Sequence, residues 1–238
     1  MAMKRRHVRL ASLVAAILFM AGAGLADAQE AVSIGGSEAL LLKPANPRGS
    51  VILMPGGNGN LKIGRDGSIH GGLARNQLVR TRGAYRAAGL AVLVVDAGVD
   101  LSAAVKYMAA IKRPVSVVAT SRGTLRAARG LAHGARPDAL VLTSGFLSDE
   151  SGSRENVMNI LHSPQALPPT LVIHHRHDGC HFTSPAGVDP FIRWSAGRAR
   201  VVWLDGGGDN GKPCKAQSHH GFKGLDGKVV ALAAHFHN

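Results

Sequence analysis

Residues 114–134, PVSVVATSRGTLRAARGLAHG, carry a serine at a position suited to nucleophilic chemistry. Val115 to Ala119 is a short apolar run, typical of a buried strand, and Arg122 to Ala132 has the Leu, Ala and Arg content of a helix. Ser121 lies between them. A chain that passes directly from strand to helix must turn sharply there and expose the serine hydroxyl, so the pattern predicts a nucleophile elbow.

The residues two before and two after the serine, Ala119 and Gly123, are small. An elbow requires small residues at these places, because the strand and helix backbones nearly touch. The segment Ala119-Thr120-Ser121-Arg122-Gly123 therefore differs from G-x-S-x-G by one methyl group. The alternative interpretation of Ser121 is an ordinary helix N-cap, and the rest of the chain must decide between the two.

A serine hydroxyl is a weak nucleophile at neutral pH, so it needs a base, and the base needs a carboxylate to fix its tautomer. Asp178 follows the predicted strand Leu171 to His174, and His220 precedes the last predicted helix. Both residues come after Ser121 in the chain. The sequence thus offers a nucleophile, an acid and a base in the order serine, aspartate, histidine.

Neighbouring residues leave the acid and the base open. Asp149 follows the predicted strand Ala139 to Thr143 and is a second candidate for the acid, whereas Asp96 precedes the serine and is interpreted as a loop or capping residue. His219 stands beside His220 and is a second candidate for the base.

An oxyanion formed during attack on a carbonyl needs two fixed N–H donors. The amide of Arg122, directly after the serine, is one candidate. The other is expected in the PGGNG loop, residues 55–59, which follows the apolar run Val51 to Met54 and whose glycines let the backbone approach a substrate closely. The amide of Gly57 or of Asn58 is predicted for this role.

Apolar runs alternate with helical patterns along the chain. A hairpin at the edge of a sheet is predicted over Val32 to Leu42 from its Gly-Gly break. Strands are predicted at 51–54, 90–95, 115–119, 139–143, 171–174 and 200–204, and helices at 74–88, 101–111, 122–132, 185–196 and 222–235, with a short helix ending at 161. This order predicts an α/β domain, with a mainly parallel, doubly wound sheet covered by helices on both faces. Ligands bind such sheets at the carboxyl ends of the strands, where the candidate residues lie.

With these residues the chain resembles the α/β-hydrolase superfamily, and specifically its small exported members without a large cap domain. The resemblance covers about Val51 to the C-terminus and is carried by the PGGNG loop, the ATSRGT elbow, the HHRHD segment and the HHGF segment. It implies the α/β-hydrolase fold with Ser121 as nucleophile, Asp178 as acid and His220 as base, and it implies no cofactor. His220 is preferred over its neighbour because the family's histidine is commonly followed by a small residue and an aromatic one.

Residues 1–28 are predicted to be a signal peptide and residues 29–238 the α/β-hydrolase domain. The basic start MAMKRRHVR precedes the apolar run Leu10 to Leu25, and Ala26-Asp27-Ala28 fits an A-x-A cleavage site, so cleavage is expected after Ala28. The run falls short of the roughly 20 residues that a spanning helix needs, so no stable membrane anchor is expected after cleavage. These features predict a periplasmic or secreted protein.

The two cysteines of the chain, Cys180 and Cys214, can pair in an oxidising compartment. Cys180 follows Asp178 closely and Cys214 shortly precedes His220, so contact between acid and base would bring the two cysteines together. A disulfide that braces the acid and the base is therefore predicted.

The sequence also suggests two other classes of function. A transition-metal site could use histidines and a cysteine, but neighbouring strand residues point to opposite faces, and no H-E-x-x-H or paired C-x-x-C spacing occurs, so no metal is expected. The residues concerned are His174, His175, His177, Cys180, His181, His219 and His220. A binding protein that keeps the hydrolase fold without chemistry would lack a member of the triad, and none is missing.

The net charge of +13 would suit a nucleic-acid partner, but the arginines are dispersed and aromatic residues make up only 4% of the chain. We therefore expect no nucleic acid, and a solvated basic surface that can associate weakly with anionic envelope material. The expected function is a serine hydrolase that acts on a small-molecule carboxylic ester or related acyl bond. The sequence leaves ester, thioester, peptide and lipid substrates open.

Overall fold

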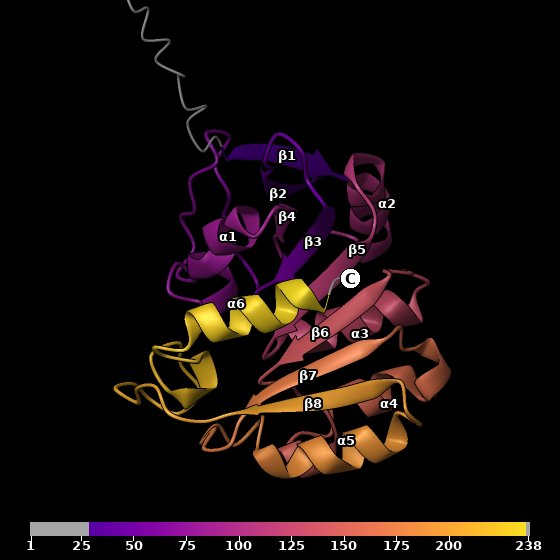
Figure 1. The fold of residues 1–238 in the computed structure, drawn as a ribbon, viewed down its shortest axis with the longest axis vertical. Helices are drawn as coiled ribbons and strands as arrows, with labels where there is room; N and C mark the ends of the chain where they lie inside the picture. The colour runs from indigo at the N-terminus through magenta and orange to yellow at the C-terminus, as the bar shows by residue number, and fades with distance from the viewer. Residues whose placement is uncertain (1–28, 237–238) are drawn as a thin grey trace, which may run out of the picture.

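An eight-stranded sheet of order β1-β2-β4-β3-β5-β6-β7-β8 forms the centre of the fold (Figure 1). The computed structural model describes residues 29–236, and the predicted signal peptide lies outside them. β1 and β2 form the predicted edge hairpin, and β2 also pairs with β4 in the antiparallel sense. The strands β4, β3, β5, β6, β7 and β8 run parallel to one another, so the predicted mainly parallel sheet is confirmed. The strands are β1 (Glu30–Ile34), β2 (Ser37–Leu42), β3 (Gly49–Met54), β4 (Leu90–Val95), β5 (Val115–Thr120), β6 (Ala139–Thr143), β7 (Thr170–His175) and β8 (Ala199–Leu204).

Helices cover both faces of this sheet (Figure 1). α1 (Gln77–Ala87) and α6 (Asp226–His235) pack on one face, while α2 (Leu101–Ile111), α3 (Gly123–Ala132), α4 (Val157–Leu161) and α5 (Val188–Trp194) pack on the other. Side chains alternate along each strand, so Val117 of β5 contacts the α2 side and Val118 contacts the α1 side. The inner strands β3 to β7 are therefore buried along their whole length and mostly apolar, as a sheet covered on both faces requires.

Short 3₁₀ turns connect several elements: η1 (Asp149–Ser151), η2 (Pro164–Ala166), η3 (Pro185–Gly187) and η4 (His219–Gly221). The connection from β6 to β7 holds only η1, α4 and η2, so no large cap domain is inserted there. The carboxyl ends of the parallel strands consequently stay open on that side.

Three helices begin at least three residues later than the sequence predicts. α5, predicted from Pro185, begins at Val188, because residues 185–187 form the 3₁₀ turn η3. The other two are α1 and α6. α1, predicted from Ala74, begins three residues later, because the Asn76 side chain accepts a hydrogen bond from a backbone amide of the first turn and caps the helix there. α6, predicted from Phe222, begins at Asp226, because η4 ends with Phe222 in a left-handed conformation with φ +55°. Both corrections lengthen loops at the edge of the sheet where the candidate residues lie.

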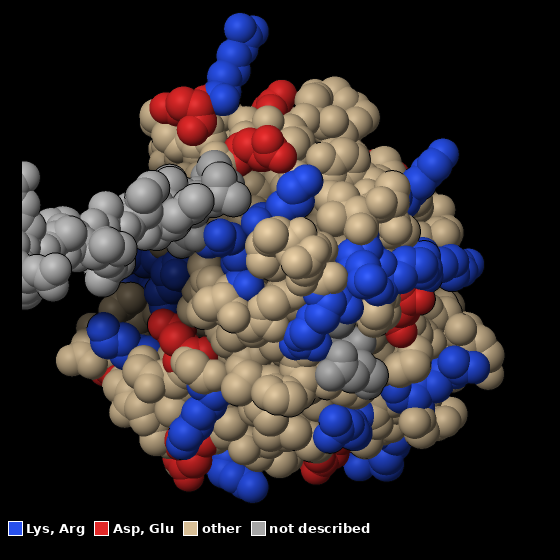
Figure 2. All heavy atoms as spheres, turned by 45° about the horizontal axis from the view of Figure 1, so that its top comes forward, with Lys and Arg blue, Asp and Glu red and all other residues tan. Residues whose placement is uncertain are grey.

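Charged side chains are dispersed over the face of the molecule that Figure 2 draws. On the face drawn in Figure 2, Lys and Arg lie between stretches of uncharged residues, with Asp and Glu among them. In the part of the chain that the structure describes, no helix is both long enough and apolar enough to cross a membrane.

The start of α3 touches the end of β3 without room for a side chain. A Cβ on Gly123 would lie 2.2 Å from the Met54 carbonyl oxygen and 2.9 Å from that of Pro55. Ala119, on the strand side of the turn, is fully buried, and its methyl group packs in the core shared with α2. The close approach of strand and helix predicted from the small residues is therefore present.

Gly123→Ala is expected to lower the free energy of unfolding by about 1–3 kcal/mol, because the β3 backbone must move to admit a methyl group. Gly83→Ala is the matched control: it lies in α1, where a Cβ meets nothing within 4 Å, and it should raise stability by about 0.5–1 kcal/mol. Urea unfolding followed by circular dichroism measures both changes. Equal midpoints for the two variants would contradict the steric argument.

Candidate active site

Ser121 occupies the turn between β5 and α3 in a left-handed backbone conformation, with φ +53°. Such a conformation costs a non-glycine residue about 1–3 kcal/mol and persists only where the surroundings over-determine it. The Ser121 amide donates to the Thr143 carbonyl at 3.0 Å, and the Ser121 carbonyl accepts from the Thr124 amide at 2.9 Å and from the Thr124 hydroxyl at 2.7 Å. The N-cap of α3 is Arg122, with no side-chain cap, so Ser121 does not act as the ordinary N-cap of the alternative interpretation.

Asp178 follows β7, and its carboxylate is fully enclosed, with a side-chain exposure of 0%. Its Oδ1 accepts from the Cys180 amide at 2.9 Å, and its Oδ2 accepts from Thr183 Oγ1 and from His220 Nδ1, each at 3.0 Å. Burial by itself raises the pKa of this carboxyl, but the hydrogen bond and charge of His220, with His174 and the Cys180 amide, outweigh burial and hold the pKa below its ordinary value. Asp178 is therefore ionised at neutral pH.

His220 lies in η4, and its ring is turned so that Nδ1 meets the Asp178 carboxylate. The His220 carbonyl accepts a hydrogen bond from Ser144 Oγ at 2.8 Å, which attaches this turn to the end of β6. A Cβ on Gly221 would lie 2.3 Å from the Ala216 carbonyl oxygen, so only glycine fits directly after the histidine. With Nδ1 donating to a carboxylate, Nε2 is the nitrogen left to act as an acceptor.

The competing candidates lie elsewhere. His219 stacks on His175 at a centroid distance of 4.2 Å, and its Nδ1 faces the His177 carbonyl at 3.2 Å. Asp149 Oδ1 accepts from the side-chain amides of Asn156 and Asn159, each at 2.7 Å, and so organises the loop before α4. Asp96 accepts from loop amides, as its interpretation as a loop residue predicts.

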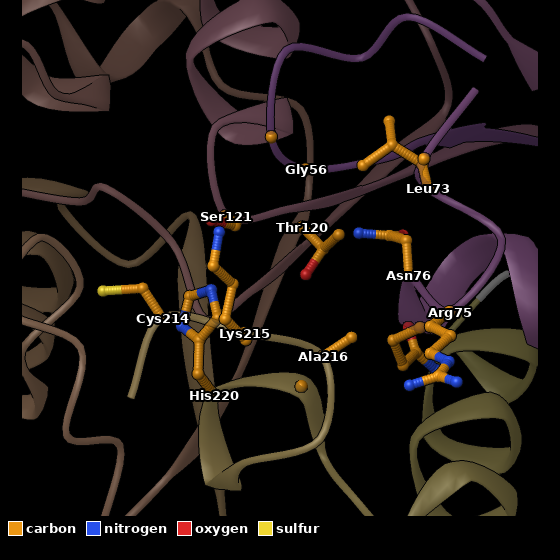
Figure 3. Close-up of a pocket in the computed structure, with 14 residues that line it drawn as sticks. Gly56, Leu73, Arg75, Asn76, Thr120, Ser121, Cys214, Lys215, Ala216 and His220 are labelled. Atoms are coloured by element: carbon orange, nitrogen blue, oxygen red, sulfur yellow. The ribbon is translucent and has the colours of Figure 1, made fainter. Parts of the chain in front are cut away.

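A cavity of about 180 Å³ opens at the ends of the strands, and Ser121 and His220 both line it (Figure 3). Figure 3 shows the His220 imidazole extending from its loop toward Ser121. The two side chains make no hydrogen bond to each other within the described residues, and this contact is often long before a substrate binds. The remaining lining residues are Gly56, Gly57, Gly72, Leu73, Arg75, Asn76, Gln77, Thr120, Cys214, Lys215, Ala216 and Gly221.

The loop after β3 turns its carbonyl groups toward protein donors. Arg126 of α3 donates to the Pro55 carbonyl and, at 3.4 Å, to the Gly57 carbonyl, while the Gly56 carbonyl accepts from the Gly59 amide at 3.2 Å. The backbone amides of Gly57 and Arg122 have no hydrogen-bond acceptor among the residues that the structure describes. Gly57 lines the cavity, whereas Asn58 does not and uses its Oδ1 to accept from a neighbouring amide.

Sequence reasoning missed three side chains that support this site: Arg126, Thr183 and His174. Thr183 Oγ1 lies 3.0 Å from both Asp178 Oδ2 and His220 Nδ1, so it touches acid and base together. Only Arg126 carried a signal, because it lies on the helix that follows the serine. The contacts of Thr183 depend on how the loop after Asp178 folds back.

His174 lies beneath the acid, fully buried, with Nε2 3.0 Å from the Thr183 carbonyl and 3.6 Å from Asp178 Oδ2. Burial lowers the pKa of His174 to about 4, so the ring is neutral at pH 7 and Nε2–H donates to that carbonyl. Its Nδ1 has no partner in the described part of the chain. This histidine fixes the loop that carries Thr183.

Cys180 and Cys214 form the predicted disulfide, with their Cα atoms 4.5 Å apart. The bond joins the loop of Asp178 to the loop that leads to His220, and Cys214 itself lines the cavity.

Among residues 29–236, no group of three or more His, Cys, Asp or Glu side chains is placed to hold a metal ion. Of the histidines considered as metal ligands, His174 and His175 lie on opposite faces of β7, as expected for a strand.

No protein-family model matches the chain, and no curated protein matches it in sequence. Solved structures do match. An α/β serine hydrolase without a lid from Xanthomonas campestris superposes with a TM-score of 0.60 at 15% identity, over 87% of this chain and 93% of that one. An esterase from Pyrococcus furiosus gives 0.61 at 14% identity, over 88% and 90% of the two chains.

The esterase domain of a Rhodothermus marinus protein is also similar, with a TM-score of 0.59 at 14% identity, over 87% of this chain and 98% of that one. At such identities the likeness establishes the fold. The chain has the α/β-hydrolase fold, and both the predicted fold class and the family resemblance are confirmed at that level.

Alkylation of the denatured protein before reduction should leave its mass unchanged, whereas reduction first should admit two alkyl groups, because both thiols are in one bond. Replacing both cysteines by serine should lower the free energy of unfolding by roughly 3–5 kcal/mol in the loop-entropy description. Intact mass and urea unfolding are the measurements. Two alkyl groups on the unreduced protein would contradict the pairing.

Proposed function

We propose that the protein is a serine hydrolase that cleaves carboxylic esters or related acyl bonds through Ser121, His220 and Asp178. The observation that carries the proposal is the convergence of a strained serine and a carboxylate-bound histidine on one cavity. Three structurally similar proteins are described as esterases or serine hydrolases, which supports the same class of reaction.

In the proposed mechanism Ser121 Oγ attacks the acyl carbon while His220 Nε2 takes its proton. Asp178 accepts the Nδ1–H of His220 at 3.0 Å, which holds the tautomer with a free Nε2 and stabilises the imidazolium as it forms. The same proton then passes to the departing alcohol. Water, activated by His220, releases the acid from Ser121 and restores the hydroxyl.

The negative charge that develops on the carbonyl oxygen is assigned to the amides of Arg122 and Gly57. Neither amide has a hydrogen-bond acceptor among the described residues. Arg126 binds the carbonyl groups of Pro55 and Gly57, the residues on either side of Gly56. Fixed donors of this kind lower the barrier because they need no reorganisation during the reaction. Of the three candidates only Gly57 lines the cavity, and the Arg122 amide is preferred over that of Asn58 because it directly follows Ser121.

The cavity favours a small acyl compound. Its volume of about 180 Å³ is below the range of about 300–1,000 Å³ typical for drug-sized ligands. We also retain export as part of the proposal, because a disulfide beside the active site is stable in an oxidising compartment.

Ser121→Ala is expected to keep the fold and to lose both fluorophosphonate labelling and hydrolysis of p-nitrophenyl acetate, because the attacking oxygen is removed. Ser33→Ala, on the exposed edge strand β1, is the matched control and should react like the parent protein. Undiminished turnover in the Ser121 variant would refute the serine mechanism. Absence of labelling in the parent protein would instead favour a binding protein with this fold.

Asp178→Asn should lower kcat by up to about 10⁴-fold, because His220 would then adopt the wrong tautomer. The equivalent change in serine proteases has an effect of this size. Asp149→Asn should change kcat little, since its carboxylate binds Asn156 and Asn159 rather than a histidine. Steady-state kinetics with one ester substrate compare the two variants. A larger loss in the Asp149 variant would move the acid to the loop after β6.

A further inference from the structure

Two cations share the cavity with the candidate nucleophile. Arg75 precedes α1, Lys215 follows Cys214, and both side chains are exposed while lining the same cavity as Ser121. Among residues 29–236, no Asp or Glu lines that cavity. Neither Arg75 nor Lys215 forms an ion pair with any residue that the structure describes.

The two cations are held on opposite walls. Figure 3 shows the Lys215 side chain extending toward Ser121, whereas the Arg75 guanidinium lies on the far side of the cavity, beyond Ala216. A negatively charged group that entered between them would therefore come close to the reacting serine. Because the cavity is small, a charged group held between the two cations would lie close to the acyl bond in the same substrate molecule.

The backbone segments that carry Arg75 and Lys215 are joined by one partly buried side chain, Arg80. Arg80 of α1 donates to the Arg75 carbonyl at 2.6 Å, to the Gly221 carbonyl at 2.7 Å and to the Ala216 carbonyl at 3.3 Å. Its charge is balanced by Asp226, with a shortest distance of 2.7 Å. Arg80 therefore forms an ion pair with Asp226, whereas the charges of Arg75 and Lys215 remain available to a ligand.

Like charges that face one cavity without a carboxylate repel one another, and an anion placed between them removes that repulsion and adds attraction to both. A cleft lined by one sign of charge also raises the local concentration of ligands of the opposite sign. We infer that the substrate is an ester, or related acyl compound, that carries a negatively charged group such as a carboxylate, bound by Lys215 and Arg75.

This inference rests on the proposed hydrolase function and adds the substrate class. The charged group can belong to the acyl half or to the alcohol half of the ester, and two pairs of substrates distinguish these cases. Phenyl hydrogen succinate and its methyl ester vary the charge on the acyl half. 4-Acetoxybenzoate and its methyl ester vary it on the alcohol half.

The measured quantity is the ratio of kcat/KM for the charged and the neutral member of each pair, with the uncatalysed rate subtracted. The parent protein should favour the charged member of one pair, and Lys215→Gln should lower this ratio by roughly five- to tenfold, mainly through KM. Arg75→Gln should act in the same direction. Lys212→Gln, an exposed lysine of the same loop that does not line the cavity, should keep the parent ratio.

Higher ionic strength should reduce the preference of the parent protein, because salt screens exposed charges. Ratios of one for both pairs in the parent protein, or a ratio unchanged in the Lys215→Gln, Arg75→Gln double variant, would overturn the inference.

Calorimetric binding of the charged esters to Ser121→Ala protein separates this inference from the proposed hydrolase function. Binding that is lost in the added Lys215→Gln change, without turnover by the parent protein, would keep the anion site and refute the hydrolase. Turnover without charge preference would refute the anion site alone. Failure of the Ser121→Ala protein to bind any charged ester more tightly than its neutral partner would also count against the anion site.

Discussion

The close contact between the end of β3 and the start of α3 is the constraint on which the candidate site depends. Gly123 leaves no space between the two backbones, so the chain must leave β5 through a tight, left-handed residue, which is Ser121. The same contact places the loop after β3 beside the serine and brings Arg126 within reach of its carbonyl groups. Ser121 and the loop after β3 are therefore positioned by the same backbone contact.

The buried carboxylate of Asp178 organises the other half of the site. An ionised carboxylate without partners would be very costly in this enclosed position, and three donors from separate residues compensate it. Its pKa is lower in the folded chain than the ordinary value of about 3.9, so the stability gained is complete above that value. It is lost as the pH falls through the lower folded pKa, when the carboxylate takes up a proton.

Much of the fold could be predicted from the sequence because each inner parallel strand is a short, mostly apolar run buried on both faces, as Leu90–Val95 illustrates. The chain order of Ser121, Asp178 and His220 likewise follows from strand ends. Helix starts were less predictable, since the cap at Asn76 and the left-handed Phe222 reflect tertiary contacts of loops. Thr183 could not be found, because its contact with acid and base exists only once a loop closes on itself.

Arg80 donates hydrogen bonds to three backbone carbonyl groups. They belong to Arg75 before α1, to Ala216 before η4 and to Gly221 at the end of η4. A planar guanidinium with five donors can serve several acceptors at once, which an ammonium group on a flexible stem cannot do with the same geometry. Local opening of the first turn of α1 would release all three stretches together. The rim of the cavity and the histidine loop are thus tied to one side chain, so a substitution of Arg80 would remove hydrogen bonds from both.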